Sequence, residues 1–148
     1  MKRWRMFIAG IAGWVALAAP GRADETAEGM RASKPDVRKE VVAVIEAQLA
    51  AFRAGELKQA YSYGSTALRA QRPLRAFVAI VQNNYPEIIA NTRAEFGLVR
   101  DDGRQATVRV HVYAKEVDAA YDYGLVKERA GWRISSVLPH DARGADRL

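Results

Sequence analysis

The sequence predicts an α+β fold in which three N-terminal helices pack on a twisted, mainly antiparallel four-stranded sheet. Two observations support this class. Residues 105–114 alternate apolar and polar side chains with hardly a break, which is typical of an antiparallel strand with one buried face. Apolar residues in segments 34–54 and 73–85 instead recur at helical spacing. Because the predicted helices precede the strands and do not alternate with them, nothing calls for a parallel sheet.

Residues 1–23 are predicted to form a secretory signal peptide. They open on basic residues and continue with an apolar run of 14 residues, 6–19. That run is shorter than the roughly 18 residues needed to span a bilayer. Small residues at Gly21 and Ala23 suit cleavage between Ala23 and Asp24. We therefore expect a periplasmic or secreted protein; the alternative is an uncleaved membrane anchor.

The composition argues against a nucleic-acid partner. The chain carries a formal net charge of +6, with 23 basic and 17 acidic residues, but four of the basic residues lie in the signal segment, which holds no acid. The rest of the chain is close to neutral and lacks the dense Lys/Arg stripe that binds phosphate backbones. We expect membrane contact only through the signal segment before cleavage.

Neither a metal nor a cofactor is expected. The chain has no cysteine, so disulfides and thiolate ligands are excluded. Its two histidines, His111 and His140, lie far apart, and no paired carboxylates accompany them. Gly124 and Gly131 are isolated and do not form a phosphate-binding loop.

Beyond the signal segment the sequence predicts one domain. Residues 24–33 are polar and aperiodic and should form a flexible linker. Residues 34–139 should form a single α+β domain that is long enough to bury a core. Residues 140–148 are charged and should form a disordered tail.

The first helix is predicted over residues 34–54. Ser33 and Asp36 fit a capping box at its start, and Gly55 fits the position just past its end. Its apolar residues fall on one face: Val37, Val41, Val44, Ile45, Leu49 and Phe52.

The next helices are shorter. Residues 56–63 predict a second helix, and residues 66–70 a further turn or short helix. A third helix should begin at Pro73 and end at Tyr85, because Pro86 disfavours helical geometry in the residue before it. Its apolar face holds Leu74, Phe77, Val78, Val81 and Tyr85.

Four strands are predicted at residues 92–99, 105–114, 121–128 and 132–138. In the first of them, Ala94, Phe96 and Leu98 should share one face. The run Asp101-Asp102-Gly103 between the first two strands is a hairpin signal. In the last strand, Trp132 and Ile134 are expected in the core.

Several weak motifs, taken in order, resemble known families. The helix Val41–Leu49, the step 51–56 and Ala60-Tyr61 resemble the opening of the nuclear transport factor 2-like superfamily, although Glu56 stands where that superfamily often has Asp. More narrowly, the segment from Phe77 through Tyr85-Pro86 to the last strand, Gly131-Trp132-Arg133-Ile134, resembles the bacterial family called domain of unknown function 4864. The resemblance covers residues 37–138.

This resemblance implies a cone: a curved sheet wrapped around helices, often with an apolar cavity inside and often dimeric. The superfamily includes enzymes, such as ketosteroid isomerase and scytalone dehydratase, as well as domains that only bind. Fold analogy therefore does not choose a function.

Tyrosines are the first group of candidate site residues, because buried tyrosine hydroxyls around an apolar cavity would suit an amphiphilic or aromatic ligand. The ligand-pocket candidates are Tyr61, Tyr63, Tyr85, Tyr121 and Tyr123. The alternative is that they are core aromatics whose hydroxyls reach the rim.

His111 is the residue best suited to acid–base chemistry. It alternates with valines, however, so it should face away from the helices, and Asp122 should do so too because its parity is opposite to that of the adjacent tyrosines. We therefore assign no catalytic residue and interpret Glu95, Asp118 and Asp122 as solvated strand acids. The outer face supplies the interaction candidates Arg109, His111 and Tyr113.

A basic cluster, Arg69, Arg72 and Arg75, surrounds the start of the third helix. It would suit an anion; the alternative is that these side chains are simply solvated. His140, next to Pro139, is expected on the surface.

We therefore expect a non-enzymatic exported domain that binds a small apolar or amphiphilic ligand, or that uses its sheet face to bind a partner or form a homodimer. The alternative is an isomerase- or dehydratase-like enzyme, which would need His111 or Asp122 inside the cone. A third reading is an accessory domain of an envelope assembly.

Overall fold

The computed structural model describes residues 29–140. The predicted signal peptide, its cleavage site and the tail beyond residue 140 lie outside these residues. The compact unit of the chain begins at Ala32.

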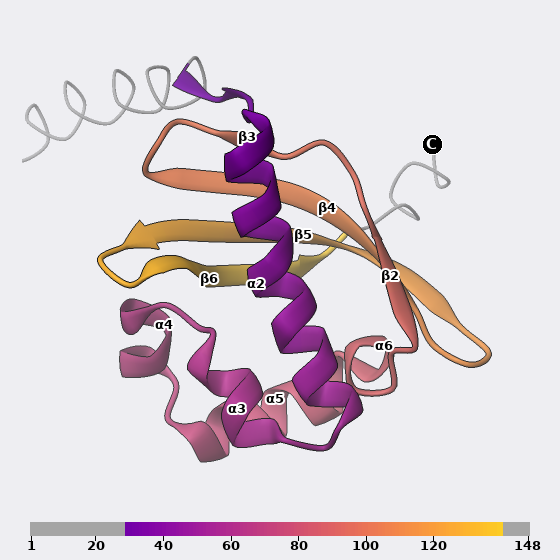
Figure 1. The fold of residues 1–148 in the computed structure, drawn as a ribbon. Helices are drawn as coiled ribbons and strands as arrows, with labels where there is room; N and C mark the ends of the chain where they lie inside the picture. The colour runs from indigo at the N-terminus through magenta and orange to yellow at the C-terminus, as the bar shows by residue number, and fades with distance from the viewer. Residues whose placement is uncertain (1–28, 141–148) are drawn as a thin grey trace, which may run out of the picture. The chain divides into compact units, whose positions relative to one another are not determined.

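Within the described residues the fold is α+β, as predicted (Figure 1). The helices are α2 (Pro35–Arg53), α3 (Leu57–Ser62), α4 (Thr66–Gln71), α5 (Leu74–Asn84) and α6 (Pro86–Ile89). The strands are β1 (Arg31–Ala32), β2 (Arg93–Phe96), β3 (Arg100–Asp101), β4 (Gln105–Tyr113), β5 (Asp118–Glu128) and β6 (Gly131–Pro139). The predicted counts of three helices and four strands were too low. The additional elements are short ones, which carry too few residues to show a period in sequence.

The long strands β4, β5 and β6 form an antiparallel meander, and β2 and β3 both pair with β4 on its other side. Glu95 in β2 pairs with His111, and Arg109 in β4 pairs with Asp122. A register shift between Gly124 and Leu125 marks a bulge in the β5–β6 pair.

The core lies between the sheet and the helices. In Figure 1, α2 crosses the face of the sheet, and the shorter helices gather near its C-terminal end. Val41, Ile45 and Leu49 of α2 are fully buried, as are Val110 and Val112 of β4. The helical stripe and the alternating strand predicted from sequence therefore face one another. Trp132 and Ile134 are also buried in the core, as predicted.

Helix α2 ends as predicted but begins differently. Gly55 has φ of +74°, its N–H donates to the carbonyl of Phe52, and the N–H of Glu56 donates to that of Ala51. These two bonds form a Schellman motif. At the start, the predicted capping box is wrong: the helix begins at Pro35, and the Ser33 hydroxyl donates to the carboxylate of Asp101 in β3 instead.

The first predicted strand, 92–99, breaks at Gly97. Strand β2 stops at Phe96, and the N–H of Gly97 donates to the carbonyl of Arg109 at 2.8 Å. Beyond this point the side-chain alternation is shifted, so Leu98 is 58% exposed while Val99 is buried. The prediction that Leu98 shares a face with Ala94 is therefore wrong.

Strand β6 forms one edge of the sheet, and the segment before α4 covers its first half. The N–H of Ser65 donates to the carbonyl of Ile134 at 2.8 Å, and the N–H of Ile134 donates to that of Tyr63 at 2.9 Å. This pairing of Gly64 with Ile134 draws α4 toward β6. It leaves the second half of β6 facing the helices α5 and α6.

Candidate functional site

A cavity of about 240 Å³ lies between β6 and the helices α2, α4, α5 and α6. Its wall is mostly apolar and includes Phe52, Phe77, Ile80, Val81 and Ile88. Phe52 and Phe77 stack with their ring centroids 6.2 Å apart. The helical stripes of α2 and α5 meet here, and exposed residues of α4 and β6 form the other side, so the cavity is a partly open cleft at the edge of the core.

Polar groups enter this wall at separate points. Gln48 is 3% exposed, and its Nε2 donates to the carbonyl of Ala60 at 3.1 Å, which leaves its side-chain oxygen free to accept. The hydroxyl of Tyr85 donates to the carbonyl of Val137 at 2.7 Å. The oxygen of Tyr85 keeps a lone pair for a ligand donor.

Arg72 lies among the lining residues at the end of α4. The hydroxyl of Tyr61 lies 2.8 Å from the carbonyl of Arg72 and 3.0 Å from that of Arg69, so it fixes the backbone on which Arg72 stands. Ser65 caps α4 by accepting from the N–H of Leu68 at 3.1 Å. Helix α4 is thus held at both ends.

The five candidate tyrosines do not form a ring around the cavity. Tyr85 lines it. Tyr61 packs behind the wall, with its ring centroid 5.2 Å from that of Phe77. Tyr63 lies further out, and its hydroxyl accepts from Gln59 Nε2 at 3.1 Å.

The other two, Tyr121 and Tyr123, are buried in the inner face of β5. Tyr121 donates to the carboxylate of Glu87, whereas the hydroxyl of Tyr123 has no partner among the described residues. Burial raises the pKa of both phenols, and the bond to Glu87 adds to the increase in the pKa of Tyr121.

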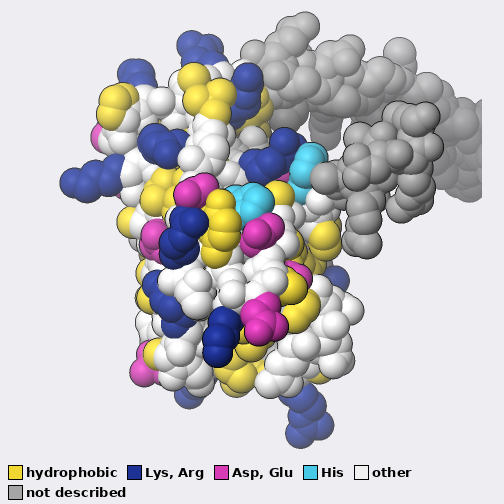
Figure 2. Space-filling model, turned by 90° about the vertical axis from the view of Figure 1, so that its right-hand side faces the viewer, with side chains coloured by type: hydrophobic (Ala, Val, Ile, Leu, Met, Phe, Trp, Pro, Cys, Tyr) yellow, Lys and Arg dark blue, Asp and Glu magenta, His cyan; other side chains and the backbone are white. Residues whose placement is uncertain are grey.

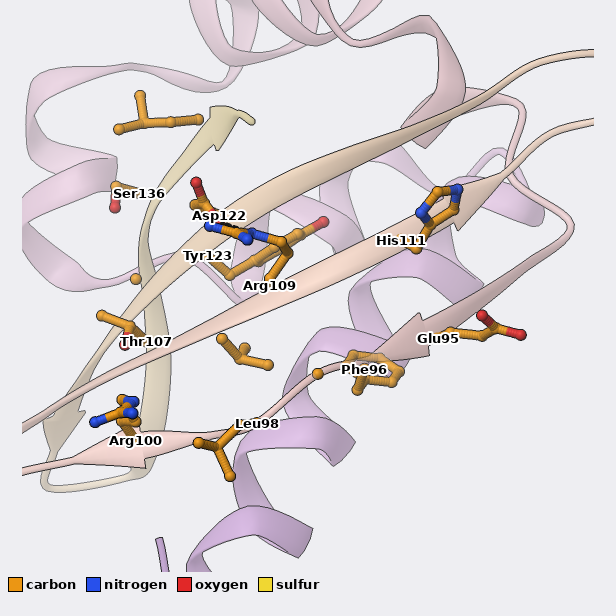
Figure 3. Close-up of a pocket in the computed structure, with 14 residues that line it drawn as sticks. Glu95, Phe96, Leu98, Arg100, Thr107, Arg109, His111, Asp122, Tyr123 and Ser136 are labelled. Atoms are coloured by element: carbon orange, nitrogen blue, oxygen red, sulfur yellow. Dashed lines mark hydrogen bonds and ion pairs between the residues drawn. The ribbon is translucent and has the colours of Figure 1, made fainter. Parts of the chain in front are cut away.

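The outer face of the sheet carries a wide groove of about 870 Å³ (Figure 3). Arg109 and Asp122 project side by side from β4 and β5, and Arg109 Nε lies 2.9 Å from Asp122 Oδ1. His140 Nδ1 lies 3.3 Å from the other oxygen of Asp122. Partial burial raises the pKa of Asp122, but the hydrogen bonds from Arg109 and His140 outweigh it, so the pKa lies below its ordinary value.

A second group of charges continues along this face. The hydroxyl of Tyr113 donates to Glu95 at 3.0 Å, and the guanidinium of Arg93 lies 3.8 Å from the centroid of the Tyr113 ring. His111 Nε2 lies 3.1 Å from Asp118 Oδ1. The hydrogen bonds from Arg93 and from Tyr113 lower the pKa of Glu95. Figure 2 shows histidine, acidic and basic side chains intermixed on one face, with hydrophobic ones between them.

The two residues that the enzyme hypothesis would place inside the cone do not line the cavity. His111 and Asp122 lie on the outer face, as their parity predicted, and both are solvent-accessible and paired with side chains there. Among residues 29–140, no group of three or more potential ligands is placed to hold a metal ion. No helix of the described chain combines the length and apolar character that crossing a membrane requires.

Sequence reasoning missed Gln48 and Ile80 as cavity residues. Gln48 stands three residues after Ile45 on the apolar stripe of α2, and a polar residue in that stripe was the available signal. The sequence gives no comparable signal for Ile80, because whether it lines a cavity depends on where β6 lies relative to α5.

The fold, the cavity and the outer groove define an α+β domain with a mostly apolar cleft at the edge of its core and a charged outer sheet face. A family model, described as domain of unknown function (DUF4864), matches residues 34–146, and the chain belongs to this family. Neither the curated proteins nor the solved structures include a significant match to the chain.

Proposed function

We propose that the protein is a non-enzymatic domain that binds a small amphiphilic ligand in the cavity between α5 and β6. The observation that carries this proposal is the cavity itself: about 240 Å³ of space with an apolar wall and a few separate polar groups. Buried core residues such as Phe77 line one side of this space, and exposed residues such as Arg72 and Ser135 line its mouth, so a ligand can enter it from solvent.

The placement of helices against one face of an antiparallel sheet supports a nuclear transport factor 2-like cone. In that architecture the cavity is the open interior of the cone. We further propose that the protein acts in the periplasm or medium, because the first 23 residues have the charge, length and cleavage pattern of a signal peptide.

Native mass spectrometry tests these proposals together. The full chain is produced in a bacterial host with its own N-terminal segment and purified gently from the periplasm. A mass that begins at Asp24 would support export, and a reproducible extra mass would support a retained ligand. A bare protein that also gives no thermal shift with apolar or amphiphilic compounds would contradict the binding proposal.

A cavity-filling variant makes the test specific. Ile80→Trp should fill the space and abolish the extra mass, because Ile80 lines the cavity from α5. Ala79→Trp is the matched control: it adds tryptophan to the same helix at an exposed position outside the cavity. Retention of the ligand by Ile80→Trp would place the ligand elsewhere.

A second candidate function, homodimer formation, is favoured by the outer groove. Leu98 and Leu138 line it and are 58% and 61% exposed, and acidic and basic side chains alternate across it. A face that carries both signs and exposed leucines is complementary to a second copy of itself turned by a two-fold axis. The predicted interaction residues Arg109 and His111 line this groove.

Light scattering over a concentration series tests the dimer. Leu98→Asp should shift the protein toward monomer, because it places a charge in the groove. Val117→Asp is the control, since Val117 is 53% exposed but lies outside the groove in the turn after β4. A wild-type protein that stays monomeric at high concentration would refute this candidate.

A further inference from the structure

We infer that the ligand of the cavity is an anionic amphiphile whose apolar tail lies between α5 and β6 and whose anionic group meets Arg72. This inference rests on the proposed binding function and names the chemical class of its ligand. Three observations carry it: the charge of the lining, the position of Arg72 and the size of the space.

The charge of the lining is one-sided. Among the described residues that line the cavity, Arg72 alone carries a formal charge, and the others are apolar or neutral polar. None of the ion pairs found among residues 29–140 involves Arg72. Arg72 is exposed at the mouth of the cavity, where its guanidinium can pair with an anion whose apolar part enters the space.

The charged groups near Arg72 either bind other partners or do not line the cavity. Glu128, the acid beside α4, accepts hydrogen bonds from the backbone and hydroxyl of Thr66 at 2.8 and 3.1 Å. Arg69 turns back, and its Nε donates to the carbonyl of Gly64 at 3.1 Å. Arg75 is exposed on α5 and does not line the cavity. Of the basic cluster noted in the sequence, Arg72 is thus the member placed to receive an anion.

Two hydrogen bonds fix the backbone of Arg72. Its carbonyl lies 2.8 Å from the hydroxyl of Tyr61, and its N–H donates to the carbonyl of Leu68 at 2.9 Å. The backbone is therefore held in place, and only the side chain is left to order when an anion binds. A guanidinium can also bind a carboxylate with two parallel hydrogen bonds.

The size of the cavity limits the tail. About 240 Å³ corresponds to roughly eight water volumes of ~30 Å³ each. This suits a short chain or a single ring better than a long acyl chain. Octanoate is therefore a suitable probe, with octanol and octylamine as neutral and cationic probes of matched length.

Calorimetric titration of the wild-type protein with the three probes at neutral pH is the experiment. Octanoate should bind about tenfold tighter than octanol, the order expected for one charge-assisted hydrogen bond, and octylamine should bind most weakly. Added salt should weaken octanoate binding and leave octanol binding unchanged.

Two arginine variants assign the effect. Arg72→Gln should lower octanoate affinity to that of octanol without changing octanol affinity, and Arg72→Lys should restore part of it. Arg75→Gln, in the same basic cluster but outside the cavity, should behave as wild type. Circular dichroism shows whether each variant is folded, and the salt series on the wild type tests the charge even if one is not.

The outcomes separate the two proposals. If octanoate and octanol bind equally well, the anionic ligand is refuted while the binding function stands. If Arg75→Gln weakens octanoate as much as Arg72→Gln does, the assignment to Arg72 is refuted. If none of the probes binds and Ile80→Trp changes nothing, the proposed binding function itself fails.

Discussion

The hydroxyl of Tyr85 donates a 2.7 Å hydrogen bond to the carbonyl oxygen of Val137, and this bond ties the end of α5 to the edge of the sheet. Strand β6 has no further strand beyond it in the described chain. The carbonyl of Val137 therefore relies on a side chain for its partner. Because both residues line the cavity, this bond also sets the separation of two of its walls.

Replacing Tyr85 with phenylalanine should therefore destabilise the protein and weaken ligand binding together. The change keeps the ring but leaves the part-buried Val137 carbonyl unpaired, at a cost of about 1 kcal/mol. Urea unfolding measures the stability, and calorimetry measures the binding.

Tyr63→Phe is the control for this variant. Its hydroxyl only accepts from the exposed Gln59 amide, so the loss should be close to zero. Equal losses for the two variants would show that the Tyr85–Val137 bond has no special role.

The parts of the fold that depend on local sequence were predictable. The end of α2 is one example: Gly55 lies in the left-handed region, and the Schellman bonds form within one stretch of chain. The start of the same helix was not, because Ser33 bonds to Asp101, a partner far away in sequence. The break at Gly97 was not predictable for the same reason. The shift in side-chain alternation after it depends on a hydrogen bond to the carbonyl of Arg109 in another strand.

The candidate site was predictable only in part. Alternation placed His111 and Asp122 on the outer face, because strand parity is a property of the sequence. The cavity depends instead on the pairing of Gly64 with Ile134, which sets α4 against β6, and on the bulge that follows. No residue pattern in the sequence encodes the separation of α4 and α5 from β6. Tyr85 was therefore named as a lining candidate together with four tyrosines that do not line the cavity.

A substitution at Gly55 tests the predicted end of α2. Gly55→Ala should lower the free energy of unfolding by about 1 kcal/mol, because a side chain in the left-handed region is strained even where the surrounding space is open. Gly55→Asn should cost less, since asparagine tolerates this conformation. An alanine variant as stable as wild type in urea would contradict the motif.

Two tyrosines of β5 should respond oppositely to the loss of one oxygen atom. The buried hydroxyl of Tyr123 has no partner among the described residues, so Tyr123→Phe should leave stability unchanged or raise it by up to about 1 kcal/mol. Tyr121→Phe removes the bond to Glu87 and should lower stability by a similar amount. Urea unfolding of both variants tests the contrast, and a large loss in Tyr123→Phe would reveal a partner for its hydroxyl.

The same two phenols should make the protein sensitive to alkali. Burial raises the pKa of Tyr123 and of Tyr121 in the folded state, whereas in the unfolded chain both return to about 10. Below that value both states hold the proton and pH has no effect through these groups. Above it the unfolded state loses its protons first, so stability falls as pH rises toward the folded-state pKa.

Unfolding in urea from about pH 9 to about pH 11, which brackets the unfolded value, should show this decline. Tyr123→Phe should reduce the slope by removing one of the two groups. If Tyr123→Phe leaves the slope unchanged, the Tyr123 phenol ionises as readily in the folded protein as in the unfolded chain, and its burial has no effect on its proton.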